Sequence, residues 1–312
     1  MSARAADDDG NDGRLDCLVV GAGPAGLTAA TYLARFHRRF VVVDGGHSRA
    51  RWIPTSHNCP GFPFGVAGPA LLQRLREQAT TYGARIVADQ VVSLRRNGNG
   101  FLAIAGSGAR WSASYVLLAT GIVDRMPPLA GVEDAIAAGV VRLCAVCDGY
   151  EAGDEDIAVY GPIADAIDHA LFLRTFSRRV TAIASDAGAP DAGALARARQ
   201  ARVAVLPMPL RLRHDADRCV AEFADAGERS FDTLYPVLGG DAQSGLATAL
   251  GARVDDNHEL LVDDQQQTSV DGLYAIGDIV SALNQISVAV GHAAIAASAI
   301  HNRLPRNFRE QA

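Results

Sequence analysis

Two cysteines near the middle of the sequence could carry out redox chemistry. Cys144 and Cys147 are separated by two residues, a spacing at which two thiols can close a small disulfide, and Asp148 follows directly. The Asp148 carboxyl group could carry the proton that thiol–disulfide exchange requires. A zinc site would need four ligands, usually from a second such pair. The other cysteines are isolated in the sequence: Cys17, Cys59 and Cys219. A redox-active disulfide is therefore favoured, with a zinc site or two unrelated buried thiols as alternatives.

A glycine-rich turn near the start of the chain could hold a dinucleotide. Residues 15–20 predict an apolar strand, and residues 27–35 have a helical pattern. The turn between them has the G-x-G-x-x-G spacing, with a proline at the expected helix start: Gly21, Gly23, Pro24, Ala25 and Gly26. The first glycine permits a tight turn, and the second lets the backbone approach a pyrophosphate. The helix N-terminus supplies N–H donors and a positive dipole. A turn without a ligand is the alternative.

An acidic residue follows where such a site would need one. A second strand at 40–43 ends in Asp44, whose carboxylate could accept a hydrogen bond from a ribose hydroxyl. Further along the chain, a strand at 115–118 leads into Ala119, Thr120 and Gly121. These segments must lie together at one edge of a sheet if they share a ligand.

A third segment identifies the type of dinucleotide. A strand at 272–276 ends in Gly277 and Asp278, and an alanine-rich helix follows at about 285–302. This combination resembles the two-dinucleotide-fold flavoprotein disulfide reductases. In that family the aspartate of the Gly-Asp pair contacts the ribityl–phosphate region of FAD, and the following helix points its N-terminus at the flavin.

Nearly the whole chain, from about residue 15 to residue 304, resembles a low-molecular-weight thioredoxin reductase. The likeness includes residues 57–61, where the family has Asn-Trp-Pro-Gly, residues 268–269, and residues 284–287 at the start of the last helix. It implies that Cys144 and Cys147 are the redox-active pair, that Asp148 is the general acid, and that the protein is a homodimer with tightly bound FAD. Arg49 could reach the FAD pyrophosphate. The expected FAD-binding residues are Gly21, Gly23, Pro24, Ala25, Gly26, Asp44, Arg49, Asn58, Ala119, Thr120, Gly121, Gly277, Asp278, Gln285 and Ile286.

The resemblance implies an α/β fold of two Rossmann-like three-layer dinucleotide-binding domains, the second inserted into the first. Residues 14–123 and 241–312 are expected to form the FAD-binding domain. Residues 124–240 are expected to form the inserted NAD(P)-type domain that carries the cysteines. The acidic, glycine-rich residues 1–13 are expected to be a disordered tail.

The inserted domain departs from the family pattern at its NADPH site. Gly161 and Ala166 match the fingerprint, but Ile163 replaces the middle glycine, where a pyrophosphate needs bare backbone. NADPH-dependent members then carry a His-Arg-Arg cluster that pairs with the 2′-phosphate. Here residues 180–196 contain no arginine, although all 29 basic side chains of the chain are arginines, and Asp186 would repel a phosphate. We therefore expect NADPH binding to be weak or lost.

The sequence thus predicts a thioredoxin reductase-like flavoprotein that exchanges electrons between FAD, the cysteine pair and an external disulfide. The partner would be a thioredoxin-like protein or a small dithiol or disulfide, and reduced ferredoxin or free reduced flavin is a candidate donor. An FAD-dependent dithiol oxidase that uses oxygen as acceptor is one alternative. A non-enzymatic flavin redox sensor is another.

Composition excludes several other classes of protein. A net charge of −6 gives no basic field for nucleic acid or an anionic membrane. No apolar run approaches the ~18 residues that span a bilayer. The absence of lysine excludes a P-loop lysine and a Schiff base. An odd number of cysteines and an acidic N-terminus favour a cytoplasmic protein. No nucleic-acid, membrane or metal partner is expected.

Overall fold

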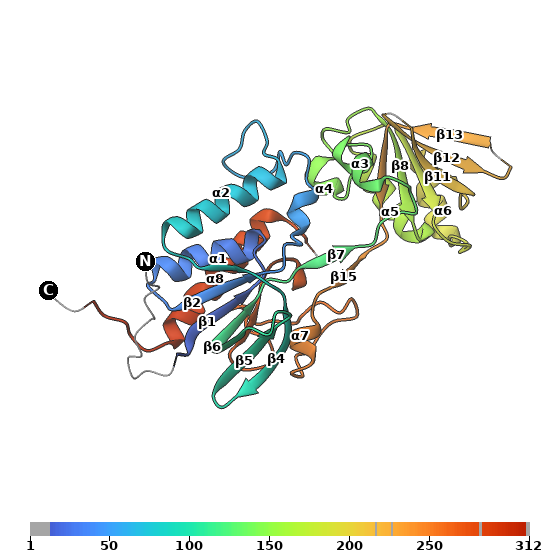
Figure 1. Ribbon diagram of the computed structural model, residues 1–312. Helices are drawn as coiled ribbons and strands as arrows, with labels where there is room; N and C mark the ends of the chain where they lie inside the picture. The colour runs from blue at the N-terminus through green and yellow to red at the C-terminus, as the bar shows by residue number, and fades with distance from the viewer. Residues whose placement is uncertain (1–12, 216, 226, 281–282, 310–312) are drawn as a thin grey trace. The chain divides into compact units, whose positions relative to one another are not determined.

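The chain divides into two compact units in its computed structural model, which describes residues 13–215, 217–225, 227–280 and 283–309 (Figure 1). The first unit comprises Met1–Ser48, Leu72–Ile122 and Ala242–Ala312. The second comprises Arg49–Leu71 and Val123–Asp241. The chain therefore leaves the first unit twice and returns to it twice.

A seven-stranded mixed sheet forms the centre of the first unit. Its strands lie in the order β3, β2, β1, β6, β5 and β4, and β16 also pairs with β6. The pairings β3–β2, β2–β1, β1–β6 and β6–β16 are parallel, whereas β6–β5 and β5–β4 are antiparallel. The strands are β1 (Leu15–Val20), β2 (Phe40–Asp44), β3 (Ile86–Ala88), β4 (Val91–Asn97), β5 (Gly100–Ala105), β6 (Arg110–Leu118) and β16 (Leu273–Ala275).

Two apolar layers cover the two faces of this sheet. On one face the helices α1 and α8 lie side by side (Figure 1), with buried alanines of α8 packed in the same cluster as Leu27 and Leu33 of α1. The last four residues of β1 are buried, and this strand contributes to both layers. A strand buried on both faces has a continuous apolar sequence rather than an alternating one. The helices are α1 (Pro24–Arg35), α2 (Gly68–Thr81), α7 (Gly245–Thr248), α8 (Ile286–Arg303) and the short η2 (Gly277–Ile279).

The second unit contains a parallel sheet in the order β10, β9, β8 and β14, and an antiparallel sheet of β11, β12 and β13. Strands alternate with helices in the parallel part, which confirms the predicted α/β class. The strands are β8 (Asp156–Gly161), β9 (Arg179–Ala184), β10 (Ala204–Leu206), β11 (Arg211–Asp215), β12 (Arg218–Phe223), β13 (Gly227–Phe231) and β14 (Thr233–Pro236). The helices are η1 (Arg49–Trp52), α3 (Val132–Ala137), α4 (Ala145–Asp148), α5 (Ile163–Leu173) and α6 (Ala192–Gln200). Where the chain crosses between the units, β7 (Ile122–Asp124) pairs with β15 (Gly240–Ala242).

The two units differ from the expected domains by the segment 49–71, and by one residue at each crossing near 123 and 241. The sequence assigns residues 49–71 to the FAD-binding domain, but they group with the second unit. Arg49 forms an ion pair with Asp124, and the Asn58 amide donates a hydrogen bond to the main-chain oxygen of Val146. These contacts link positions distant in sequence, so no local pattern could reveal them. The assignment of a cofactor to each domain stays a prediction.

The ends of the chain and its helices give two further results. Of the expected tail, residues 1–12 lie outside the described residues, and Gly13 is exposed. Among the residues that the structure describes, none of the helices has both the length and the apolar character needed to cross a membrane.

We predict that Leu173→Ala lowers the free energy of unfolding by about 2–5 kcal/mol, because Leu173 is completely buried in the core of the second unit. Leu210→Ala is the matched control, since Leu210 belongs to the same unit and is 70% exposed. That change should stay within about 0.5 kcal/mol. Urea unfolding followed by circular dichroism measures both. Equal losses for the two variants would contradict this placement of the core.

Candidate redox site and dinucleotide cradle

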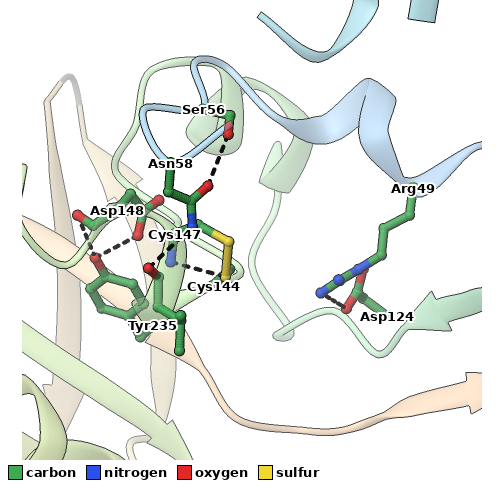
Figure 2. Close-up of a disulfide and its surroundings, with 9 residues drawn as sticks. Arg49, Ser56, Asn58, Asp124, Cys144, Cys147, Asp148 and Tyr235 are labelled. Carbon is green, nitrogen blue, oxygen red and sulfur yellow. Dashed lines mark hydrogen bonds and ion pairs between the residues drawn. A yellow bond between two sulfur atoms is a disulfide. The ribbon is translucent and has the colours of Figure 1, made fainter. Parts of the chain in front are cut away.

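Cys144 and Cys147 form a disulfide at the short helix α4 (Figure 2). Cys144 precedes the helix in an extended conformation, and its sulfur accepts a hydrogen bond from the Cys147 N–H at 3.1 Å. The Cα atoms of the two cysteines are 5.3 Å apart. Val146 between them is 54% exposed. The structure therefore contains the two cysteines as a bonded pair and not as separate thiols.

The three remaining cysteines differ chemically from this pair. Cys17, Cys59 and Cys219 are free thiols and are buried. Burial raises the pKa of all three, that of Cys219 to about 11. Because the thiolate is the reactive form, burial disfavours reaction at these three thiols. Cys59 therefore behaves as a small apolar residue.

Asp148 is the last residue of α4 and follows the disulfide directly. Burial raises the pKa of its carboxyl group to about 6, although a hydrogen bond from Tyr235 and the positive charge of Arg142 act in the opposite direction. The Tyr235 hydroxyl donates to Asp148 Oδ1 at 2.8 Å (Figure 2). A carboxyl group with a pKa close to neutral pH can both give and accept a proton, as a general acid–base must.

A polar network fixes α4 to the sheet of the second unit. Arg142 donates from Nη1 to the main-chain oxygen of Asp148 at 3.1 Å and from Nη2 to Glu155 Oε1 at 3.2 Å. The Thr233 hydroxyl donates to the other Glu155 oxygen. Thr233 and Tyr235 both belong to β14, so the orientation of the acid depends on a strand that lies far along the chain from α4.

The segment 49–71 supplies polar side chains near the disulfide. Asn58 Nδ2 donates to the Val146 oxygen at 3.4 Å, and the Ser56 hydroxyl donates to Asn58 Oδ1 at 3.1 Å (Figure 2). Arg49 makes a bidentate contact with Asp124, at 2.6 Å from Nε and 2.8 Å from Nη2. The sequence assigns Arg49 and Asn58 to FAD. Those roles stay predictions.

In the first unit, the glycines of the fingerprint allow very close backbone contacts. Gly21 has a φ of +107°, and a Cβ atom added there would lie 2.3 Å from the Ala119 oxygen. A Cβ at Gly26 would lie 2.0 Å from the Gly21 oxygen. The paired ends of β1 and β6, Val20 and Leu118, bring these loops together. Only glycine therefore fits at positions 21 and 26 without movement of the backbone.

The N-terminus of α1 has the features of a phosphate site. Gly23 is the N-cap residue, no side chain caps the helix, and Pro24 occupies the first turn together with Ala25. Asp44 ends the adjacent strand β2, accepts a hydrogen bond from the Gly46 N–H at 2.9 Å and pairs with Arg76. Uncapped N–H donors at the carboxyl ends of parallel strands suit a dinucleotide pyrophosphate.

The loop of residues 21–26, with the N-terminus of α1, is the dinucleotide cradle of the first unit. The other expected cofactor residues of this unit approach it. A Cβ at Gly277 would lie 3.0 Å from the Cβ of Ala25 and 3.8 Å from that of Ala289, so Gly277 and the neighbouring Asp278 lie beside the first turns of α1 and α8. Gln285 is the N-cap residue of α8, which begins at Ile286, and no side-chain hydrogen bond caps this helix. The Thr120 hydroxyl donates to the Gln243 oxygen at 2.8 Å, and Gly121 follows with a φ of +65°. The residues present therefore fit an FAD molecule.

Three residues around the acid were not predicted from the sequence: Tyr235, Arg142 and Glu155. Tyr235 lies in an apolar strand and belongs to no motif, and its contact with Asp148 spans 87 residues. A single buried tyrosine in a strand looks like an ordinary core residue. The only available signal was the acid itself, because a buried carboxylate requires hydrogen-bond donors.

Comparisons with known proteins agree with this geometry. The family model described as "Pyridine nucleotide-disulphide oxidoreductase" matches residues 15–293. A thioredoxin reductase of Peptoclostridium acidaminophilum is 28% identical, over 95% of this chain and 98% of its own length. A bifunctional thioredoxin reductase/thioredoxin of Mycobacterium leprae (strain TN) is 31% identical, over 85% of this chain and 60% of its own length. The crystal structure of thioredoxin reductase from Streptococcus pyogenes MGAS5005 is similar with a TM-score of 0.85 and 26% identity, over 94% of this chain and 98% of that one. This similarity confirms the predicted fold of two dinucleotide-binding domains.

We predict that Gly21→Ala reduces the FAD content of the purified protein and its stability, because the added Cβ would collide with the Ala119 oxygen. Gly46→Ala is the control. Gly46 also has a positive φ, but no atom lies within 4 Å of its added Cβ, so it should cost only about 1–2 kcal/mol of backbone strain. Flavin absorbance after gel filtration and urea unfolding measure the two effects. Equal FAD contents and midpoints for the two variants would argue against a close approach at Gly21.

A second prediction concerns stability and pH. A raised pKa means that folded Asp148 keeps its proton where the unfolded chain has lost it. The wild type should therefore lose stability relative to Asp148→Asn as the pH rises between about 4 and 6, by about 1.4 kcal/mol per unit of pKa shift, with no further change above that window. Urea unfolding at a series of pH values measures the difference. A difference that does not vary with pH would show that the Asp148 pKa is not raised.

Proposed function

We infer from the family match how the residues of this chain act. The chain belongs to the pyridine nucleotide-disulphide oxidoreductase family, and it is an FAD-dependent disulfide oxidoreductase of the thioredoxin reductase type. We propose that the Cys144–Cys147 pair exchanges two electrons with an external dithiol or disulfide and that Asp148 is the general acid–base. The observation that carries this proposal is a disulfide at the second unit's surface with a partly buried carboxyl group next to it. When bound in the cradle of the first unit, FAD supplies the second two-electron carrier.

The exchange at the cysteines follows ordinary thiol–disulfide chemistry. A thiolate of the partner attacks one sulfur of the pair, a mixed disulfide forms, and the bond between Cys144 and Cys147 breaks. The released cysteine takes the electron pair and a proton from Asp148. The second thiolate of the partner then attacks the mixed disulfide and frees the other cysteine. The partner leaves as a disulfide, two electrons remain on the cysteine pair, and the reverse sequence reduces a partner disulfide.

A thioredoxin-like protein or a small dithiol is the proposed partner. One relative carries both activities in its name, thioredoxin reductase and thioredoxin. Around the disulfide of this chain, Val146 and Tyr150 are exposed, Tyr150 to 83%. Exposed apolar and aromatic side chains beside the reactive sulfurs suit a protein or small-molecule surface that is itself apolar.

Weak or absent NADPH binding is part of the proposal. Ile163 begins α5, and its side chain is buried in the apolar core of the second unit at the position of the expected middle glycine. In the turn after β9, Asp186 accepts a hydrogen bond from the Gly188 N–H. Arg197, the first arginine beyond that turn, pairs with Asp168 at 3.0 Å. These features support a donor other than NADPH, such as reduced ferredoxin, free reduced flavin or a dithiol.

The same features favour a second candidate, an FAD-dependent dithiol oxidase. If NADPH does not supply electrons, a dithiol substrate can supply them at Cys144 and Cys147, and oxygen is then the terminal acceptor. The chemistry at the cysteines is unchanged and only the direction of electron flow differs.

Oligomeric state and location are proposed from the family resemblance. We propose a homodimer formed through the first unit, where α1 and α8 leave Tyr32, Val290 and Ile295 exposed. We also propose a cytoplasmic location, as is typical of thioredoxin reductases.

An anaerobic titration tests the proposal. Stoichiometric NADPH should leave the flavin absorbance of the wild type nearly unchanged, whereas dithiothreitol should bleach it through the cysteine pair. Cys144→Ser should retain FAD but resist bleaching by dithiothreitol, and Cys219→Ser, which changes a buried free thiol, is the control. Oxygen uptake after addition of a dithiol distinguishes the oxidase from the reductase. Prompt bleaching by NADPH would reject the weak-binding proposal, and normal bleaching of Cys144→Ser by dithiothreitol would reject the role of the cysteines.

A further inference from the structure

Tyr235 contacts the proposed acid from the interior of the second unit. Its side chain is 2% exposed, and it lies on β14, the last strand of the parallel sheet, in register with Val159 of β8. The hydroxyl lies 2.8 Å from Asp148 Oδ1 and 3.4 Å from the main-chain oxygen of the same residue. A hydroxyl has one proton to donate, and the shorter contact to the carboxyl oxygen takes it.

The carboxyl group of Asp148 has one side-chain donor among the described residues. In the described part of the chain, Tyr235 is the one side chain that donates a hydrogen bond to it. The charged groups that face Asp148 are Arg142, Glu151 and Glu155. Arg142 uses its donors on the Asp148 main-chain oxygen, on Gly139 and on Glu155. The two glutamates are acceptors when ionised and cannot orient a carboxylate.

We propose that Tyr235 is a positioning residue that fixes which oxygen of Asp148 carries the catalytic proton and sets the pH at which Asp148 gives it up. This inference rests on the proposed function of Asp148. Because Tyr235 donates to Oδ1, Oδ1 is the carbonyl oxygen of the protonated acid, and the transferable proton is on Oδ2. After transfer, the same hydrogen bond stabilises the carboxylate.

Tyr235 remains a donor throughout the cycle. Burial, together with the neighbouring Asp148 carboxyl, raises the pKa of Tyr235 above that of an ordinary tyrosine. Its proton is therefore never released in the range where Asp148 titrates. Tyr235 therefore acts through Asp148, the residue that its hydroxyl contacts.

The test measures how fast dithiothreitol opens the Cys144–Cys147 disulfide in the FAD-loaded protein. Samples are quenched with an alkylating reagent, and the modified cysteines are counted by mass spectrometry. Each rate is divided by the fraction of dithiothreitol present as thiolate. For the wild type, the corrected rate should fall as the pH rises through about 6, where Asp148 loses its proton.

Tyr235→Phe should move this fall upward by about one pH unit, because the carboxylate loses a charge-assisted hydrogen bond. Tyr160→Phe is the matched control, since Tyr160 is a buried tyrosine on the neighbouring strand β8 and should leave the profile in place. Asp148→Asn should flatten the profile and lower the corrected rate at low pH by about a hundredfold.

The outcomes separate the two ideas. If Asp148→Asn flattens the profile but Tyr235→Phe does not move it, the inference about Tyr235 is wrong and the proposed acid stands. If Asp148→Asn keeps the wild-type profile, both are wrong. Should Tyr235→Phe fail to fold, the chain is produced with 3-fluorotyrosine, whose more acidic hydroxyl is a stronger donor. The profile of that protein should move to lower pH, and an unmoved profile overturns the proposal.

Discussion

A partly buried carboxyl group beside a disulfide is the constraint around which the second unit is organised. Removing an ionisable group from water disfavours its charged form, and this raises the pKa of Asp148 to about 6. In the proposed role, Asp148 can transfer a proton near neutral pH only if its neighbours keep the shift of its pKa moderate. Tyr235 does so from β14 and Arg142 from the segment before α4, and Glu155 binds Arg142 in turn. A helix of four residues is thereby held in a defined orientation.

In the first unit, glycines allow the backbone to pack closely around the expected pyrophosphate site. A pyrophosphate needs bare backbone and free N–H groups, so the loop after β1 must approach both its own helix and the neighbouring strand β6. The backbone contacts at Gly21 and Gly26 leave no room for a Cβ atom. Gly277 also lies close to Ala25, because it has no Cβ atom. This contact brings the start of α8 toward the start of α1. Two uncapped helix N-termini therefore meet at the edge of one sheet.

The second unit has a similar parallel sheet, but the residues in its loops differ from those of the first unit. At the start of α5 a buried isoleucine stands where the first unit has glycine. Arg197, the first arginine beyond the turn that follows β9, makes an ion pair with Asp168 on the protein surface. The sheet holds β14, and β14 carries Tyr235 to Asp148 and Thr233 to Glu155. On the proposed function, the inserted unit supports the cysteines more than it binds a nucleotide.

The sequence by itself determined whatever depends on residues close together along the chain. The spacing of Cys144 and Cys147 predicted a disulfide, and the glycines between a strand and a helix predicted a dinucleotide loop, because ring closure and tight turns are local. Apolar runs and family resemblance predicted the α/β class. Tertiary structure alone decided which groups surround Asp148, that Arg49 meets Asp124, and that residues 49–71 group with the second unit. The Tyr235–Asp148 and Arg49–Asp124 contacts join positions 87 and 75 residues apart. The pKa of a carboxyl group depends on burial and on neighbours that only the folded chain brings together.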